Sequence, residues 1–88
     1  MVEEVNKKLV GKIEHYFSKI GVAIVELIDY LSVGDEILIQ GVETNFTQKV
    51  ESMQIEHESI ENAKAGDAIG MKVSDKVREN DQVYKILG

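Results

Sequence analysis

A short glycine-acid step interrupts the 88-residue sequence twice, at Gly34-Asp35 and at Gly66-Asp67. A related acidic step, Glu79-Asn80-Asp81, occupies a third such place. Each step closes a turn-rich stretch and precedes an apolar run, at residues 37–39, 68–73 and 83–86. Because glycine and asparagine tolerate the backbone conformations of tight turns, this rhythm predicts short strands separated by turns.

Six segments have the residue pattern of a β-strand. Some alternate apolar and polar residues, and others are rich in β-branched residues. They are residues 9–17, 22–27, 36–40, about 46–56, 68–73 and 82–87. Six short strands at this spacing predict an all-β fold, a six-stranded closed antiparallel β-barrel, because closure removes exposed strand edges from a small sheet. Residues 9–88 are expected to form this single domain after a polar N-terminal lead-in of residues 1–8.

The fourth segment contains an irregularity. Val50 has the opposite parity to Met53 and Ile55, so a regular strand would send them to different faces. One extra residue near Glu51-Ser52 would turn both sets inward, and we therefore predict a β-bulge there. The alternative is a strand with two half-buried faces.

Residues 57–66 show no strand pattern. Ile60, Ala63 and Lys64 are at helical spacing, which predicts a loop with room for a single helical turn.

The formal net charge of -6, with a pI near 4.8, argues against unspecific binding to nucleic-acid backbones. A local contact stays open, because the ten lysine and arginine residues could gather on one side. The absence of cysteine excludes disulfides and fits a reducing compartment. No apolar run is long enough to cross a bilayer, so we expect a cytoplasmic protein without membrane contact.

Motifs for catalysis are missing from the sequence. It contains neither a phosphate-binding glycine loop nor a G-x-S-x-G elbow. His15 and His57 lack the spacing of a metal pair. Glu14, Glu56 or Glu58 could complete a metal site with them, but the two histidines are better explained as exposed polar side chains. We therefore expect no catalytic residue, no metal and no cofactor, and a non-enzymatic protein.

Two consecutive stretches, residues 50–58 and 63–70, resemble domain 2 of elongation factor Tu and its archaeal and eukaryotic counterparts. The shorter elements at residues 10–13 and 33–37 fit the same family pattern. This resemblance implies a six-stranded barrel of the translation-protein type. It implies a binding module that contacts tRNA or rRNA, the ribosome or a translation protein. Because the GTPase domain of that family is absent, neither GTPase activity nor nucleotide binding is carried over.

The resemblance also points to a contact surface. Its candidate partner-binding residues are Gln54, Glu56, His57, Glu58, Asp67 and Ala68. Three of these residues depart from the family, which has glutamate at the position of Gln54 and frequently histidine and asparagine at those of Glu56 and Ala68. The familiar recognition of an aminoacyl end is therefore not expected.

A second resemblance rests on His15-Tyr16-Phe17 and on residues 19–23. These residues are similar to the accessory barrels of collagenase-like peptidases and of related RNA-modifying enzymes. The alternative function is therefore an accessory barrel that docks on a separately encoded peptidase-like or RNA-modifying enzyme.

Overall fold

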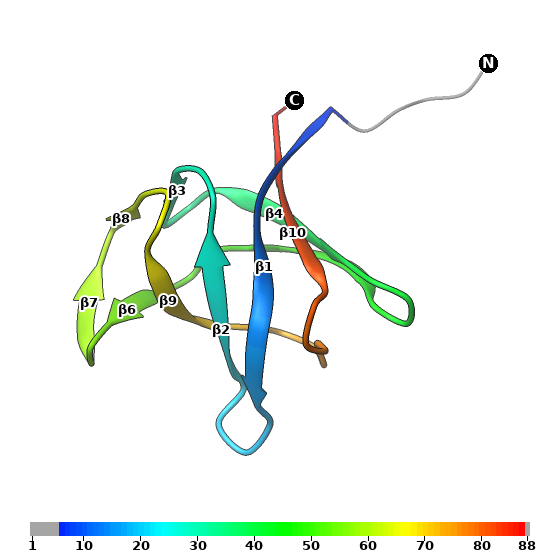
Figure 1. Cartoon of the computed structure of the whole chain (residues 1–88), viewed down its shortest axis with the longest axis horizontal. Helices are drawn as coiled ribbons and strands as arrows, with labels where there is room; N and C mark the ends of the chain where they lie inside the picture. Colours follow the sequence, from blue (N-terminus) through cyan, green and yellow to red (C-terminus); the bar gives the residue numbers. More distant parts are fainter. Residues whose placement is uncertain (1–5, 88) are drawn as a thin grey trace.

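The computed structural model describes residues 6–87, in which ten β-strands pair antiparallel (Figure 1). The strands are β1 (Lys7–Phe17), β2 (Val22–Leu27), β3 (Leu31–Ser32), β4 (Glu36–Gln40), β5 (Asn45–Lys49), β6 (Met53–Ile55), β7 (Glu58–Ile60), β8 (Asn62–Ala63), β9 (Ala68–Lys72) and β10 (Gln82–Ile86). Eight of them form one sheet in the order β5-β4-β10-β1-β2-β9-β6-β7, while β3 and β8 pair separately. The predicted all-β antiparallel fold is confirmed.

The predicted strand positions agree closely along most of the chain. β2 and β4 have the expected bounds, and β9 and β10 each end one residue early. β1 begins at Lys7, so Lys7 and Lys8 of the expected lead-in pair with β10. Residues 1–5 of that lead-in lie outside the described residues.

The irregular fourth segment is divided into β5 and β6 by residues 50–52. Val50 and Met53, on the two sides of the break, are both buried. The N–H of Val50 donates to the carbonyl of Asp35 at 2.8 Å, so Val50 still bonds to the segment that precedes β4, whereas Met53 pairs with Met71 of β9. The expected irregularity is therefore present, as a break between two strands rather than a bulge within one.

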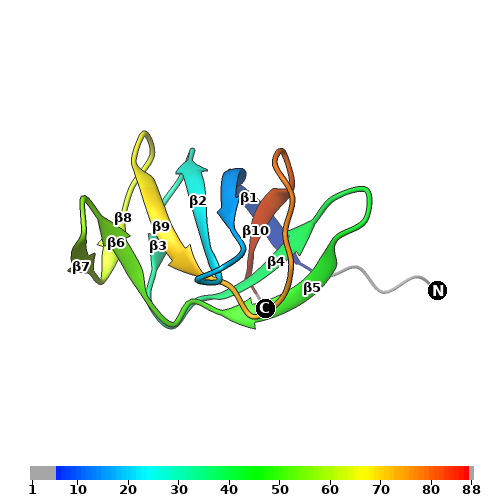
Figure 2. The same cartoon turned by 90° about the horizontal axis from the view of Figure 1, so that it is seen from below.

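The described residues do not form a closed ring of strands, so the predicted closed six-stranded barrel is not confirmed. The sheet is strongly curved (Figure 2), but β5 and β7 are its free edges. The break after β5 explains this, because β5 pairs with β4 whereas its continuation, β6, pairs with β9. The side chain of Gln48 bridges the gap: its Nε2 donates to the carbonyl of Lys72 and its Oε1 accepts from the N–H of Ser74.

The predicted loop at residues 57–66 is wrong in part. This stretch contains β7 and β8, and it contains no helical turn. Ile60 pairs opposite Met53, and the buried Ala63 pairs opposite Leu31. Distant partners therefore fix strands that the local sequence pattern does not announce.

One apolar core fills the concave side of the sheet. On β2 the buried residues Ala23, Val25 and Leu27 alternate with more exposed ones, as a half-buried strand requires. The fully buried large side chains come from eight parts of the chain: Val10, Ile13, Val25, Leu27, Leu31, Ile37, Ile39, Val50, Met53, Ile69, Met71 and Val83. Each such side chain stabilises the fold by about 1.5–3 kcal/mol through burial.

The three acidic steps form the same turn. In each, the aspartate N–H donates to the carbonyl of the residue three positions earlier, and the aspartate carboxylate accepts from that residue's N–H. The aspartates are Asp35, Asp67 and Asp81, and their partners are Ser32, Lys64 and Arg78. The carboxylate therefore satisfies a backbone donor at the start of its own turn.

The third residue of each turn has a positive φ, namely 96° at Gly34, 93° at Gly66 and 75° at Asn80. Its N–H donates to the carbonyl of a buried residue elsewhere in the fold, and the N–H of that residue donates back to the carbonyl of the turn aspartate. The buried partners, in the same order, are Val50, Leu27 and Ile13. Each turn is thereby locked onto the core by a pair of backbone hydrogen bonds.

Candidate functional site

The hairpin between β6 and β7 has an unusual tip. Ile55 pairs with Glu58, which leaves Glu56 and His57 as a two-residue loop. Both loop residues have positive φ, 51° and 69°. Such loops favour Asn-Gly, because most residues with a Cβ are strained in this conformation, whereas glycine has no Cβ and asparagine tolerates it through local hydrogen bonds. The chain therefore places a carboxylate and an imidazole where glycine or asparagine would be more stable.

A surface hollow lies between this tip, at the lower left of Figure 1, and the β1–β2 hairpin, at the bottom of the view. Its volume is about 390 Å³, and it is lined by Phe17, Ile20, Val22, Ile24, Gln54, Glu56, His57, Ala68 and Gly70. Phe17 and Ile20 remain 44% and 64% exposed. We call this depression the apolar hollow, because aliphatic and aromatic side chains supply most of its lining.

Four of the six predicted site residues lie together in the apolar hollow: Gln54, Glu56, His57 and Ala68. The other two are not part of it. Glu58 is exposed at the start of β7, and the Asp67 carboxylate is engaged by the N–H of Lys64. Asp67 lines a separate shallow depression with Tyr30 and Asn62.

The larger apolar residues of the hollow were not among the predicted site residues. Val22 and Ile24 lie on the outer face of β2, opposite the core residues of the same strand. The sequence of β2 nevertheless contains a sign of this surface, because it has apolar residues on both faces. An antiparallel sheet normally needs apolar residues on one face only.

The part of the chain beside the hollow is acidic. Residues 50–63 contain four glutamates and neither lysine nor arginine. All four glutamates, Glu51, Glu56, Glu58 and Glu61, are exposed. The β6–β7 hairpin is therefore negatively charged, and Glu56 lines the hollow itself, while the exposed Lys72 of β9 lies opposite Val22 on the other side.

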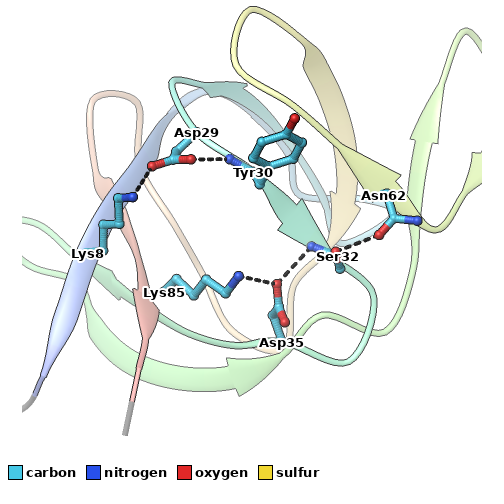
Figure 3. Close-up of polar contacts among 7 residues, drawn as sticks. All are labelled: Lys8, Asp29, Tyr30, Ser32, Asp35, Asn62 and Lys85. Atoms are coloured by element: carbon cyan, nitrogen blue, oxygen red, sulfur yellow. Dashed lines mark hydrogen bonds and ion pairs between the residues drawn. The ribbon is translucent and has the colours of Figure 1, made fainter.

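A polar network lies near the opposite end of β1 (Figure 3). Lys8 pairs with Asp29 at 2.6 Å, and the N–H of Tyr30 donates to the same carboxylate. The hydrogen bond from Lys8, followed by that from the Tyr30 backbone, lowers the pKa of Asp29 below its ordinary value. Lys85 similarly contacts Asp35 at 3.3 Å. These pairs tie β1 and β10 to neighbouring turns, so we assign the network a structural role.

Neither histidine lies in a metal-binding arrangement, since residues 6–87 contain no group of three or more His, Cys, Asp or Glu placed to hold an ion. His15 instead contacts Glu79 at 3.3 Å and packs against the edge of Phe17. His57 lines the apolar hollow. No helix in the part of the chain that the structure describes is long and apolar enough to span a membrane.

Sequence comparison relates the chain to proteases. It is 42% identical over 76 residues to an uncharacterised protease of Methanocaldococcus jannaschii and 42% identical over 81 residues to a collagenase of Porphyromonas gingivalis. These matches cover 85% and 90% of this chain but only 19% and 22% of the two proteins. The chain thus spans about a fifth of the length of the relatives it matches. No protein-family model matches the chain.

Solved structures give the same relationship. The C-terminal domain of a Geobacillus thermoleovorans protein assigned to the U32 peptidases superimposes with a TM-score of 0.84 at 25% identity, covering 89% of this chain and 91% of that domain. Its selenomethionine variant superimposes with a TM-score of 0.82 at 24% identity, covering 86% and 96%. The chain therefore resembles a terminal domain of a larger protein. In particular, it resembles the C-terminal domain of U32 peptidases, the collagenase-like proteases.

The comparisons overturn the likeness to elongation factor Tu, and the predicted module for RNA, the ribosome or a translation protein is wrong. The error has a physical origin. The Gly-Asp steps that suggested the family form turns, and turn chemistry recurs in unrelated small β-folds. The second resemblance, to the accessory barrels of collagenase-like peptidases, is the one that the comparisons support.

Proposed function

We propose that the chain is an accessory domain of a collagenase-like peptidase, that it packs against the catalytic part of that enzyme, and that it contributes no catalytic group. The main support is the share of each protein that the matches cover. About nine-tenths of the chain aligns with a solved domain of the same size, while the protease relatives are about five times longer. The matching unit is therefore one domain among others in those proteins.

The geometry supports a binding role for this domain. It presents an apolar hollow on its surface, and Phe17 and Ile20 leave large apolar side chains exposed there. Such patches on a small soluble domain commonly mark contact surfaces. Since the chain has no cysteine, we further propose that it works in the reducing environment of the cytoplasm.

The curved sheet provides a rigid support for that surface. We propose that it behaves mechanically as a six-stranded barrel, with β5 and β6 acting as one bent strand. The side-chain hydrogen bonds of Gln48 to Lys72 and Ser74 support this, because they bridge the place where the backbone ladder is interrupted.

Affinity purification from the organism that makes the chain tests the proposed function, with both proteins and RNA identified and an unrelated acidic domain of similar size as the control. The proposal predicts enrichment of a peptidase similar in sequence to the Methanocaldococcus jannaschii protease. Recovery of an RNA-modifying enzyme, of RNA, or of unrelated proteins in its place would overturn the proposal.

A further inference from the structure

We propose that the apolar hollow binds a polypeptide segment with a large apolar side chain flanked by lysine or arginine. This inference deepens the proposed function by naming the docking surface, and it rests on that function for the identity of the protein that carries the segment. The hollow itself is defined by this chain alone.

The apolar part of the segment follows from the lining. Single exposed hydrophobic residues are ordinary on protein surfaces. Here, however, four apolar side chains from two strands and a hairpin tip face one depression: Phe17, Ile20, Val22 and Ile24. Its volume of about 390 Å³ lies within the range of known ligand pockets. A large aliphatic or aromatic side chain bound in the hollow would displace water from the surfaces of all four of these side chains.

The placement of the polar groups in the hollow favours a side chain of a polypeptide over a free small molecule. Small-molecule sites use a few convergent polar groups to fix the orientation of the ligand. In this hollow the polar side chains Gln54, Glu56 and His57 come from β6 and the adjoining hairpin tip, beside the apolar residues. A polypeptide could place its apolar side chain over those residues and its polar backbone over the hairpin tip.

The basic flanks follow from charge complementarity. Glu56 lies at the rim, and the neighbouring exposed glutamates Glu51, Glu58 and Glu61 extend the negative surface without an intervening cation in residues 50–63. Two cations lie on the other side, Lys19 next to Ile20 in the β1–β2 hairpin and Lys72 opposite Val22, so the negative charge is concentrated at the β6–β7 hairpin. Opposite charges across an interface raise the association rate and select the partner, so lysine or arginine beside the apolar anchor is favoured.

The hairpin tip is held in place before binding. Glu56 and His57 are confined to positive φ by a two-residue loop whose ends, Ile55 and Glu58, are paired. Strained residues in such a loop frequently mark a functional position. A rim that is already ordered loses less conformational entropy on binding than a flexible one.

Two synthetic tetrapeptides test the proposal. In the first, leucine and phenylalanine lie between two lysines; in the second, the same residues lie between two glutamates. Each is titrated into the 15N-labelled 88-residue chain and followed by amide chemical shifts. We expect shifts confined to residues 17–24, 54–57 and 68–70, and an affinity for the basic peptide at least about tenfold higher than for the acidic one. Added salt should reduce that preference.

Two variants provide the controls. Ile20→Ser removes an exposed apolar side chain and should abolish binding of both peptides. Glu56→Lys should reverse the charge preference. Shifts centred elsewhere, equal affinity for the two peptides, or no binding at about 1 mM peptide would overturn the proposal. Concentration-dependent dimerisation through Ile20 would also overturn it, because the hollow would then be occupied by a second copy.

The outcomes separate this inference from the proposed function. If a peptidase is captured equally well by the Ile20→Ser variant, the docking surface is wrong but the accessory function stands. If the basic peptide binds in the hollow and no peptidase is captured, the hollow stands but the accessory function is wrong.

Discussion

Asn80 and Ile13 are joined by a backbone hydrogen bond of 2.8 Å, in which the N–H of Asn80 donates to the carbonyl of Ile13. Ile13 is fully buried, whereas Asn80 lies in an exposed turn with a φ of 75°. Gly34 and Gly66 hold the equivalent places in the other two turns. The positive φ therefore aims one backbone donor from each turn at the core, and this explains why glycine or asparagine stands there.

The conformational requirement predicts unequal effects of alanine and glycine. Gly34→Ala should destabilise the fold by about 1–2 kcal/mol, because alanine is strained in the left-handed conformation. No steric clash adds to this cost, since an added Cβ meets no neighbour within 4 Å. Asn80→Gly should change stability by less than about 0.5 kcal/mol. Urea unfolding of both variants checks this, and equal losses would show that φ is not the determining factor.

The contribution of each turn aspartate to the stability of the fold should increase with the burial of its carboxylate. Asp81 is only 4% exposed and its hydrogen bond with the N–H of Arg78 is part-buried, so Asp81→Ala should cost about 1–3 kcal/mol. Asp67 makes the same bond but is half-buried, so Asp67→Ala should cost less. Melting temperatures of the two variants give the comparison. A larger loss for Asp67→Ala would contradict the burial argument.

A steric prediction concerns Gly41 in the β4–β5 connection. A Cβ built at Gly41 would overlap the Asp81 carboxylate, although this glycine does not have a positive φ. We expect Gly41→Ala to destabilise the fold by about 1–3 kcal/mol through overpacking. Combining it with Asp81→Gly should reduce that cost in a double-mutant cycle of unfolding free energies. Strict additivity of the two changes would exclude the overlap.

Relieving the strain in the β6–β7 hairpin tip should raise the stability of the fold and weaken peptide binding. Replacing Glu56 by Asn and His57 by Gly gives the sequence that a two-residue loop prefers, and should stabilise the fold by about 1 kcal/mol or more. The same change removes a rim carboxylate and should weaken binding of the lysine-containing peptide. Thermal unfolding and peptide titration measure the two effects. An unchanged melting temperature would mean that the tip is not strained.

The ion pair of Lys8 and Asp29 predicts a pH dependence of stability. The pKa of Asp29 is lowered in the folded chain, chiefly by the hydrogen bond from Lys8, so the unfolded chain binds its proton more readily. The stabilisation is therefore present above the ordinary carboxyl pKa and is lost as the pH falls through the lowered one. Urea midpoints of the native chain and of Asp29→Asn should converge in acid. Midpoints that stay equally separated at every pH would contradict this, and high salt should shrink the difference.

The sequence predicted the regular strands well because their information is local. The β-branched run of residues 22–27 and the Gly-Asp turns need no distant partner to be recognised. β7 and β8 were not predicted, because strands of three and two residues are too short to show an alternating apolar pattern. Pairing with Met53 and Leu31 decides their conformation instead. The predicted closure of the barrel failed for a similar reason, because the break at residues 50–52 separates β5 from β6.

The candidate site was predicted in part and for the wrong reason. Gln54, Glu56, His57 and Ala68 do come together, but they were chosen through a likeness to a translation factor that the comparisons overturn. Phe17 and Ile20 were missed because residue type alone does not show which apolar side chains remain exposed. Only the folded arrangement brings the two hairpin tips to one hollow.

Direct binding of this chain to the catalytic part of a collagenase-like protease is the decisive test of the proposed accessory function. The partner is the Methanocaldococcus jannaschii protease shortened by the segment that matches this chain, with its fold verified by circular dichroism, and the measurement is isothermal titration calorimetry. We expect a one-to-one complex with a Kd on the order of 10 µM or lower, and a loss of at least about tenfold in affinity for Ile20→Ser. No detectable binding of the native chain at about 1 mM would contradict the proposed accessory function.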